Sequence, residues 1–400
     1  MCWRRRRRCL RVRGRWRPCV VVFLYYLLAV ILVENILISI VHHRQSPITP
    51  ADYYDVAVVR DNLSSSNVVE TTAPRTTTTP TTTVSTLRAT ASQNRSTHRT
   101  VAAPPTSPST KELEELFYRR RPHPVNPYGH RVLLEPTRLC RPDTRMVILV
   151  HSHHPHQDRR DAIRSTWGEA VRTGSWPREN RTRSCAGLRL AFVFGLHRDP
   201  GLNDLVAEEH ARHDDVVQGD FADSYQNMTL KSLLDLKVVD EHCPRVRYLL
   251  KTDDDMVVNL PYLLDILTRT SPTRSFMGPY NPRSRVNRNG VWKLTLDEFP
   301  FQFYPPYESG SAYVITGDLI HELFVTAEYV PHIFVDDVYV TGILGRVLGV
   351  KHIRQAGFAY WGTKAPTACD LVKRRIITGT KMHPQRLCAL WNDLQLNPKC

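Results

Sequence analysis

Acidic residues are absent from the first seventeen positions of this 400-residue chain, which hold nine arginines. The formal net charge is +15, and removing these nine charges leaves +6 for the remainder. A net charge of this size does not indicate that the rest of the chain binds nucleic acid, although it would help to attract anionic substrates. The excess of positive charge therefore belongs to one short segment.

Closely spaced cysteine pairs are also missing, so the nine cysteines show no zinc-ligand spacing. Internal repeats are not detected either. Three cysteines lie in the N-terminal segment, where they would stay reduced or become acylated: Cys2, Cys9 and Cys19. The other six permit three disulfides, whose pairing the sequence does not separate: Cys140, Cys185, Cys243, Cys369, Cys388 and Cys400.

Residues 20–41 form a mostly apolar run that is long enough to span a bilayer. A small-residue cleavage site is not obvious after it, and the arginines before it place residues 1–19 in the cytosol. We therefore expect a single-pass type II signal anchor with the following residues in the lumen. Glu34 weakens this prediction, costing about 2–3 kcal/mol if it is central in the span. A cleaved signal peptide, or a basic nucleic-acid-binding tail beside a buried helix, is the alternative.

Periodicity of helix or strand is lacking between residues 42 and 108, where Thr, Ser and Pro dominate. Such a composition cannot bury a core and predicts an extended, O-glycosylated stalk. We assign residues 42–142 to this luminal stem and its linker. Four Asn-x-Ser/Thr acceptors on the luminal side support the topology mildly: Asn62, Asn94, Asn180 and Asn227.

From Arg145 onward strand and helix patterns alternate, which predicts an α/β domain over residues 143–400. Repeated strand–helix units predict a mostly parallel sheet with helices on both faces. The expected strands are 146–150, 188–194, 216–217, 248–250 and 313–316. The expected helices run through 162–167, over 202–213 and 229–241, from near 260, and from 336 onward.

Three consecutive carboxylates, Asp253, Asp254 and Asp255, follow the apolar strand at 248–250. Three like charges repel one another, and a divalent cation such as Mg²⁺, Mn²⁺ or Ca²⁺ would remove that repulsion. Ligands of open α/β sheets bind beyond the carboxyl ends of the strands, where these acids would lie. We infer a metal that bridges the protein to the diphosphate of a nucleotide-sugar. The alternative is an acidic turn that caps the helix starting near Leu260.

Two further groups of residues are ambiguous taken alone. Arg160 and Arg164 share one helix face that could meet phosphates or a nucleobase, although pairing with neighbouring acids explains them as well. Asp223 and Lys231 lie at a helix entrance, where an anion or a simple cap fits equally. The histidine-rich loop is better explained as an ordinary loop than as a zinc site: His151, His153, His154 and His156.

Two later segments are candidates for acceptor binding and proton transfer. The Pro- and Gly-shaped loop from Tyr304 to Tyr313 carries aromatic rings that would stack on sugars, or it is an ordinary turn. Asp336 and Asp337 open a helix, where capping explains them, and where a general base is also possible. We expect the helix dipole to lower the pKa of such a carboxylate and keep it ionised.

Together these motifs resemble glycosyltransferase family 31, the β-1,3-galactosyl- and β-1,3-N-acetylglucosaminyltransferases. Their sequences look closest to those of the galactosyltransferase branch. The matching segments occur in the family's order: Arg159–Gly168, Asp220–Lys231, Tyr248–Asn259, Tyr304–Gly310 and Asp337–Val340.

The resemblance implies a GT-A type fold, a UDP-sugar donor, Mn²⁺ (with Mg²⁺ possible), and inversion at the anomeric carbon. It implies that Asp337 is the catalytic base and that Asp255, with Asp253, binds the metal. The donor side would include Arg160, Arg164, Asp223, Lys231, Asp253 and Asp254. The acceptor side would include Tyr307, Ser309, Gly310 and Asp336. A Golgi location, an acceptor glycan on protein or lipid, and dimers with itself or other transferases are further expectations.

Three departures from the family pattern matter. Asp336 stands where the family usually has Glu, and Glu308 stands where galactosyltransferase-like relatives often have Cys. Thr380 occupies the place of a C-terminal metal-binding His, so either His383 substitutes or the coordination is altered.

Galactose is the expected sugar, with N-acetylglucosamine or N-acetylgalactosamine as alternatives. A different class of function is a membrane-tethered, lectin-like protein whose acids bind Ca²⁺. An inactive family member that serves as partner to an active transferase is a third.

Overall fold

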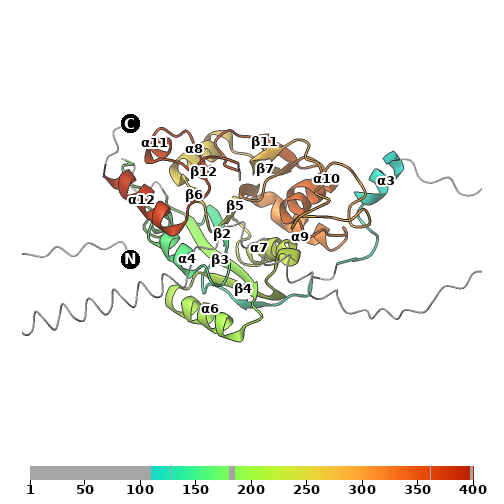
Figure 1. The fold of residues 1–400 in the computed structure, drawn as a ribbon, viewed down its shortest axis with the longest axis horizontal. Helices are drawn as coiled ribbons and strands as arrows, with labels where there is room; N and C mark the ends of the chain where they lie inside the picture. Colours follow the sequence, from blue (N-terminus) through green and yellow to red (C-terminus); the bar gives the residue numbers. More distant parts are fainter. Residues whose placement is uncertain (1–109, 127, 180–184, 361, 397–399) are drawn as a thin grey trace, which may run out of the picture. The chain divides into compact units, whose positions relative to one another are not determined.

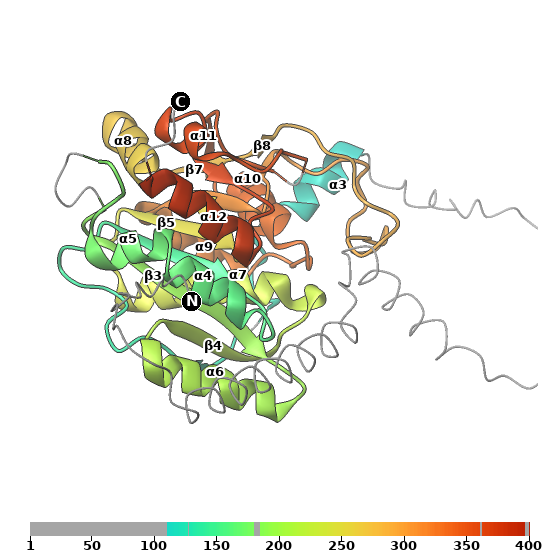
Figure 2. The same ribbon diagram turned by 60° about the vertical axis from the view of Figure 1, so that its left-hand side comes forward.

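The computed structural model describes residues 110–126, 128–179, 185–360, 362–396 and 400, which belong to one compact unit. A central sheet with helices on both sides forms this unit (Figures 1 and 2). Within these residues the sheet has eight strands, which lie in the order β1 (Val132–Leu134), β4 (Val216–Ala222), β3 (Leu188–Leu196), β2 (Met146–His151), β5 (Tyr248–Asp253), β10 (Ala312–Thr316), β7 (Ser275–Gly278) and β11 (Lys351–Arg354).

The sheet is mixed rather than mostly parallel. Strands β4, β3, β2 and β5 are parallel neighbours, as the strand–helix alternation predicts. Strand β10 runs antiparallel to both β5 and β7, and β1 runs antiparallel to β4. Strands β7 and β11 are parallel again. The prediction therefore holds for the half of the sheet built from regular strand–helix units and fails at β1 and β10, which run antiparallel to their neighbours.

Two hydrophobic cores cover the two faces of the sheet. Successive side chains of a strand point to opposite faces, so Ile148 and Val150 of β2 belong to one core while Val147 and Leu149 belong to the other. The first core packs against α4 (Gln157–Arg164), α5 (Trp167–Thr173), α6 (Pro200–His213), α8 (Leu260–Thr270) and α12 (Pro384–Gln395). The second packs against α7 (Met228–His242), α9 (Ile320–Ala327) and the π-helix η3 (Val338–Leu344).

The first predicted helix is broken in two. It ends at Arg164, and α5 begins at Trp167, because Thr166 leaves helical geometry with φ −123° and ψ −114°. The expected helices at 202–213 and 229–241 are confirmed as α6 and α7, within two residues at each end. The helix expected from 336 is a π-helix continued by a short α10 (Gly345–Val347).

Short elements complete the unit. They are α3 (Thr110–Phe117), η1 (Tyr225–Asn227), β6 (Val257–Val258), β8 (Tyr280–Asn281), β9 (Tyr307–Glu308), η2 (Gly317–Leu319), α11 (Ala368–Val372) and β12 (Thr378–Gly379). Strand β1 pairs with β4, and Tyr118 and Leu139 are buried in the second core. The compact unit thus takes in residues 110–142, which the sequence assigns to the linker.

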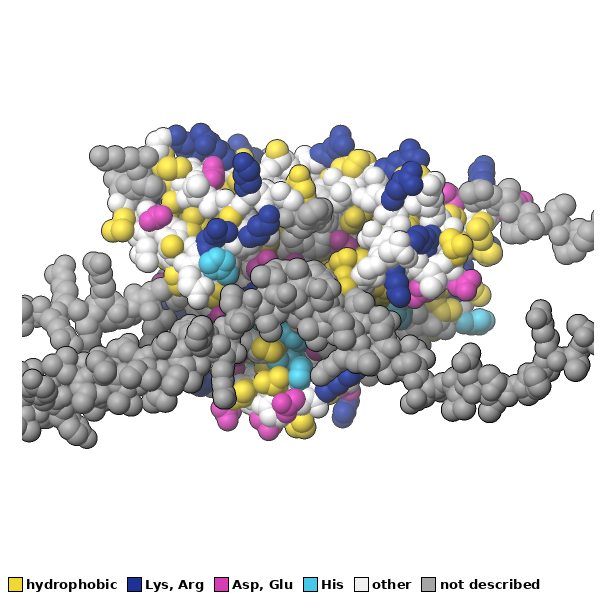
Figure 3. All heavy atoms as spheres, in the orientation of Figure 1, with side chains coloured by type: hydrophobic (Ala, Val, Ile, Leu, Met, Phe, Trp, Pro, Cys, Tyr) yellow, Lys and Arg dark blue, Asp and Glu magenta, His cyan; other side chains and the backbone are white. Residues whose placement is uncertain are grey.

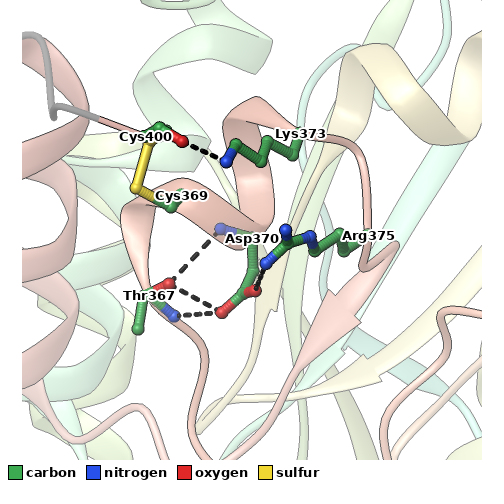
Figure 4. The surroundings of a disulfide bond; sticks show 6 residues. All are labelled: Thr367, Cys369, Asp370, Lys373, Arg375 and Cys400. Atoms are coloured by element: carbon green, nitrogen blue, oxygen red, sulfur yellow. Dashed lines mark hydrogen bonds and ion pairs between the residues drawn. A yellow bond between two sulfur atoms is a disulfide. The ribbon is translucent and has the colours of Figure 1, made fainter.

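Two disulfides are present among the described residues, Cys140–Cys243 and Cys369–Cys400. The second joins α11 to the last residue, and Figure 4 shows Lys373 donating to the carbonyl of Cys400 beside it. Thr367 and Asp370 form a capping box at the start of α11. The sequence permits a third disulfide, and the two that the structure shows involve four of the six cysteines.

None of the helices built from the described residues is long and apolar enough to cross a membrane. The basic tail at 1–19, the anchor at 20–41 and the stem up to residue 109 lie outside the described residues. On the face drawn in Figure 3, Lys and Arg side chains occur at many separate places, with Asp and Glu among them.

Candidate functional site

The carboxyl ends of the parallel strands bring the predicted residues to one edge of the sheet. Strands β2 and β5 are in register with His151 beside Asp253. Strands β3 and β4 end beside them at Leu196 and Ala222, the residue before Asp223. This edge is where ligands of such sheets bind, and it collects the aspartates, the histidine loop and Asp223, as the sequence predicts.

The middle aspartate of the three, Asp254, is turned into the protein. Its carboxylate accepts hydrogen bonds from Ser152 Oγ at 2.8 Å, His156 Nδ1 at 2.9 Å and Arg159 at 3.0 Å. Burial works to raise the pKa of Asp254, but the hydrogen bonds and charges of His156 and Arg159 outweigh it, so the pKa is lowered. Asp254 is therefore an ionised clamp that ties the acidic turn to the start of α4.

Asp253 and Asp255, the outer two aspartates, differ from Asp254 in that their pKa values are raised. The Asp253 side chain keeps 39% of its surface exposed and accepts from Lys251 Nζ at 2.9 Å. Burial and the charge of Asp255 raise the pKa of Asp253 to about 6, against the lowering effect of Lys251. Burial and the charge of Asp254 raise the pKa of Asp255, and no side-chain donor among the described residues bonds to its carboxylate.

These two carboxylates fit a hard divalent cation. Repulsion and burial make the ionised form of these carboxylates unfavourable, and a bound cation would relieve both effects. Carboxylate oxygens are ligands that suit Mn²⁺ and Mg²⁺. Asp255 has the freer carboxylate of the two, and its role as a metal ligand stays a prediction.

The C-terminal segment runs beside the acidic turn. Strand β12 pairs with β6, and the Met382 N–H donates to the Asp255 carbonyl at 2.9 Å. Thr380 is buried, while His383 is exposed and caps α12 by accepting from the Arg386 N–H. The structure therefore brings the backbone next to His383 to Asp255, and the metal-binding role of His383 stays a prediction.

Asp337, the predicted base, is held by two backbone donors. Its carboxylate accepts from Gly310 N–H at 2.8 Å and from Val338 N–H at 2.7 Å, at the start of η3. Burial and the neighbouring Asp336 raise its pKa to about 7, although Lys251 and the two N–H donors oppose this. The expectation that the helix dipole lowers this pKa is wrong, because burial and a second carboxylate are stronger. A pKa near neutrality suits a general base.

The predicted acceptor loop lies against Asp337. Gly310 donates its N–H to that carboxylate, and Ser309 donates its own N–H to the Pro279 carbonyl at 3.1 Å. Burial and the charge of Asp337 raise the pKa of Tyr307 to about 12, which places the phenol in the electrostatic field of the carboxylate. Tyr307, Gly310 and Asp337 are thus brought together.

Asp336 is placed differently from its predicted acceptor role. It is buried, and its carboxylate accepts from Ser232 Oγ of α7 at 2.7 Å and lies 3.8 Å from Lys251 Nζ. These contacts favour a role beneath the site. Glu308, at the family's Cys position, is also fully buried and pairs with His352 at 3.0 Å.

Arg160 and Arg164 are occupied by carboxylates of the chain itself. Both guanidinium groups pair with Glu209 of α6, at 2.7 Å and 2.5 Å, and Arg164 also pairs with Asp215 at 2.8 Å. Arg160 is only 1% exposed and also donates to the carbonyl of His153 at 2.8 Å. The structure shows both arginines bracing α4 and the histidine loop, and donor contact by them stays a prediction.

A second group with metal-ligand geometry consists of His153, His154 and Asp223. Burial lowers the pKa of His154 to about 4, and both of its ring nitrogens are buried without a hydrogen-bond partner among the described residues. Asp223, however, already pairs with Lys231 Nζ at 2.7 Å and accepts from Gly195 N–H at 3.0 Å. Lys231 thus supplies the positive charge that a cation would bring.

Sequence reasoning missed two buried polar groups. Lys251 contacts both Asp253 and Gly310, and its position in an otherwise apolar strand was the available signal. Asp235 pairs with His151 at 2.7 Å. Burial raises the pKa of this aspartate and lowers that of the histidine. The sequence signal for Asp235 was weaker: it is a charged residue on a buried helix face, and its partner His151 lies 84 positions away.

Comparison of the sequence with known proteins places the chain in a family. A family model described as Galactosyltransferase matches residues 158–356. Beta-1,3-galactosyltransferase 1 of Mus musculus is 32% identical over 285 residues, 70% of this chain and 82% of that protein, and the Homo sapiens protein of that name gives the same values. N-acetyllactosaminide beta-1,3-N-acetylglucosaminyltransferase 4 of Mus musculus is 34% identical over 238 residues, 59% of this chain and 65% of that protein. The resemblance carried by the motifs is confirmed: the chain belongs to the galactosyltransferase family, glycosyltransferase family 31, and is a hexosyltransferase.

Proposed function

We propose that this chain is an inverting transferase of GT-A type that moves galactose from UDP-galactose to the 3-hydroxyl of an acceptor glycan in β-1,3 linkage. One observation supports this most directly. Lys251 contacts both Asp253 and Gly310, and Gly310 contacts Asp337, so a metal-binding carboxylate and a near-neutral carboxylate belong to one cluster. Metal-assisted departure of a diphosphate and deprotonation of a hydroxyl need such a pair.

Asp253 and Asp255 would hold Mn²⁺, or Mg²⁺ in its place. When bound there, the ion would neutralise the charge that develops on departing UDP. His383 is the candidate for a third ligand, because the residue before it bonds to the Asp255 backbone.

Asp337 would accept the proton of the acceptor's 3-hydroxyl. Its two backbone donors fix the carboxylate, and its raised pKa makes it a stronger proton acceptor than an exposed aspartate. Tyr307, Ser309 and Gly310 would line the acceptor side, with Asp336 supporting them from below. Asp223, Lys231 and Asp254 would shape the donor side, with Arg160 and Arg164 bracing it.

N-acetylglucosamine or N-acetylgalactosamine is the alternative sugar, and the N-acetylglucosaminyltransferase relative is the observation that favours the first. The acceptor would be an oligosaccharide on a glycoprotein or glycolipid. We also propose that residues 20–41 anchor the enzyme in the Golgi membrane as a type II protein, with the stem and the transferase domain in the lumen. Association with itself or with other transferases is a further proposal.

The test incubates the full-length chain with UDP-galactose, UDP-N-acetylglucosamine or UDP-N-acetylgalactosamine and a panel of acceptor sugars, with Mn²⁺ or EDTA. A β-1,3 product that requires Mn²⁺ and is lost in Asp337→Asn supports the proposal and identifies the sugar. Metal-dependent glycan or UDP binding without transfer would instead favour the lectin-like or inactive alternative.

A matched pair of variants separates the two metal-ligand groups. Asp255→Asn is expected to weaken Mn²⁺ binding, while His153→Gln leaves it unchanged, because the Asp223 carboxylate beside His153 is already paired with Lys231. The reverse result would move the metal to the histidine loop.

A further inference from the structure

Lys251 places a buried ammonium group next to the candidate site. The side chain is 3% exposed and lies on β5, between the apolar Leu250 and the acidic turn. A buried ammonium is costly unless hydrogen bonds and opposite charges satisfy it. Its surroundings therefore show what this lysine is placed to hold.

Three groups from three parts of the chain surround the Lys251 ammonium. It donates to Asp253 Oδ1 at 2.9 Å and to the Gly310 carbonyl at 2.7 Å, and it lies 3.8 Å from Asp336 Oδ2. The first two contacts are hydrogen bonds, and the third is a charge–charge contact beyond hydrogen-bond distance. Lys251 is thus the point at which the acidic turn, the acceptor loop and the start of η3 meet.

The contact with Gly310 extends to the candidate base. Gly310 receives Lys251 at its carbonyl and gives its own N–H to Asp337 at 2.8 Å, so one peptide segment is fixed at both ends. A Cβ atom at Gly310 would lie 3.3 Å from Asp337 Oδ2, which shows how closely the loop backbone approaches that carboxylate. Strands β5 and β10, paired with Lys251 beside Tyr313, supply the rigid base for this arrangement.

We propose that Lys251 is a positioning residue that holds the metal-binding carboxylate of Asp253 and the loop aiming Asp337 in one fixed geometry. This inference rests on the proposed transferase function of Asp253 and Asp337. Lys251 would act through these two groups, without itself binding substrate or metal. Its removal should free the Gly310 loop and so disturb the aim of the base, while Asp253 loses a competing positive charge and stays available to a cation.

The test compares Lys251→Met and Lys251→Arg with Lys237→Met in the full-length chain. Lys237 is the matched control, because it pairs with Glu241 at 2.7 Å on the outer side of α7. Hydrogen exchange of the peptide containing the Gly310 amide reports the loop without any turnover. Mn²⁺ binding in the presence of UDP, kcat, both KM values and the pH profile of kcat/KM complete the comparison.

In Lys251→Met we expect faster exchange at Gly310, a kcat about 100-fold lower as for a misplacement of about 1 Å, and Mn²⁺ binding no weaker than in the parent. The acidic limb of the pH profile should move to higher pH, because the Lys251 charge opposes protonation of Asp337. Lys251→Arg keeps the positive charge but not the short contact to Gly310. The acidic limb should therefore keep its position on the pH axis, while hydrogen exchange at Gly310 should still become faster.

Unchanged exchange at Gly310 in Lys251→Met overturns the proposal, as does a kcat equal to that of Lys237→Met. If Lys251→Met does not fold, Lys251→Arg decides, and unchanged exchange and kcat in that variant overturn the proposal. Absence of transfer by the parent chain would overturn the proposed function instead, and the exchange comparison would still test Lys251.

Discussion

Adjacent aspartates in one turn have opposite tasks in this protein. Asp254 is satisfied by Ser152, His156 and Arg159, whereas Asp255 has no side-chain donor among the described residues. A carboxylate that is already hydrogen-bonded to protein groups stabilises the fold, and one that is repelled by its neighbours is available to a cation. The three acids are therefore not interchangeable.

Substitution of these two residues should separate stability from metal binding. We expect Asp255→Asn to weaken Mn²⁺ binding by about 100-fold, since a direct ligand matters at least as much as an outer partner, with little change in the free energy of unfolding. Asp254→Asn should lower that free energy by about 1–3 kcal/mol, because it leaves buried donors without their anion. Mn²⁺ titration and urea unfolding measure the two effects, and equal effects of the two variants would contradict this division.

The pKa of Asp337 gives a pH dependence with a definite sign. A base must be deprotonated to act, and burial with Asp336 raises this pKa to about 7. We expect kcat/KM to fall as the pH drops through about 7 and to level off above it. Asp337→Asn should lower kcat by about 100- to 10,000-fold and abolish this limb. A limb near pH 4 in the parent chain would show that the pKa of Asp337 is not raised, and a limb near pH 7 that survives in Asp337→Asn would show that another group titrates.

At the scale of elements, pairing between very short segments completes the site. Strands β6 and β12 have two residues each, yet their pairing brings the segment that contains Thr380 and His383 to the acidic turn. Trp167 of α5 adds a second support by donating from its indole N–H to the Met256 carbonyl at 3.1 Å. The acidic turn is therefore fixed from two sides by elements distant in sequence.

His383 can be tested as both cap and ligand. It caps α12 through its imidazole, and Asn is a strong cap that cannot replace an imidazole on a metal. We expect His383→Ala to lower the free energy of unfolding by about 1 kcal/mol relative to His383→Asn. If His383 is a metal ligand, both variants should weaken Mn²⁺ binding alike. Weakened binding in the Ala variant alone would mean that the cap, not the ring, matters.

Sequence patterns predicted these elements unevenly. Strands such as β2 and helices such as α7 were predicted because they are long enough for their apolar pattern to show in the sequence. The break at Thr166 was not, although Ser165, Thr166 and Gly168 are weak helix formers, because Ile163 and Trp167 continue the helical spacing of apolar residues across it. The π-helix was missed because its seven residues are too few for the apolar pattern to distinguish i→i+5 from i→i+4 bonding.

At the scale of the whole molecule, the sequence located the candidate carboxylates but not their partners. Like charges crowded at a strand end are visible in a linear sequence, as are Asp337 and the aromatic loop before it. The buried pairs Arg160–Glu209 and Lys251–Gly310 are 49 and 59 positions apart, and only folding shows them. The electrostatic state of Asp337 was likewise misjudged, because burial exists only in the folded chain.

The two disulfides should contribute unequally to the stability of the whole unit. Cys140–Cys243 closes a segment of 103 positions that contains β2, β3, β4 and α7, while Cys369–Cys400 closes 31 positions near one edge. Chain entropy lost by the unfolded state grows with loop length, so the first bond is worth up to about 4.7 kcal/mol and the second less. We expect the Cys140→Ala/Cys243→Ala double variant to have a lower urea midpoint than Cys369→Ala/Cys400→Ala. A larger loss from the second pair would show that its local contacts, including the bond from Lys373 to the Cys400 carbonyl, outweigh the difference in loop length.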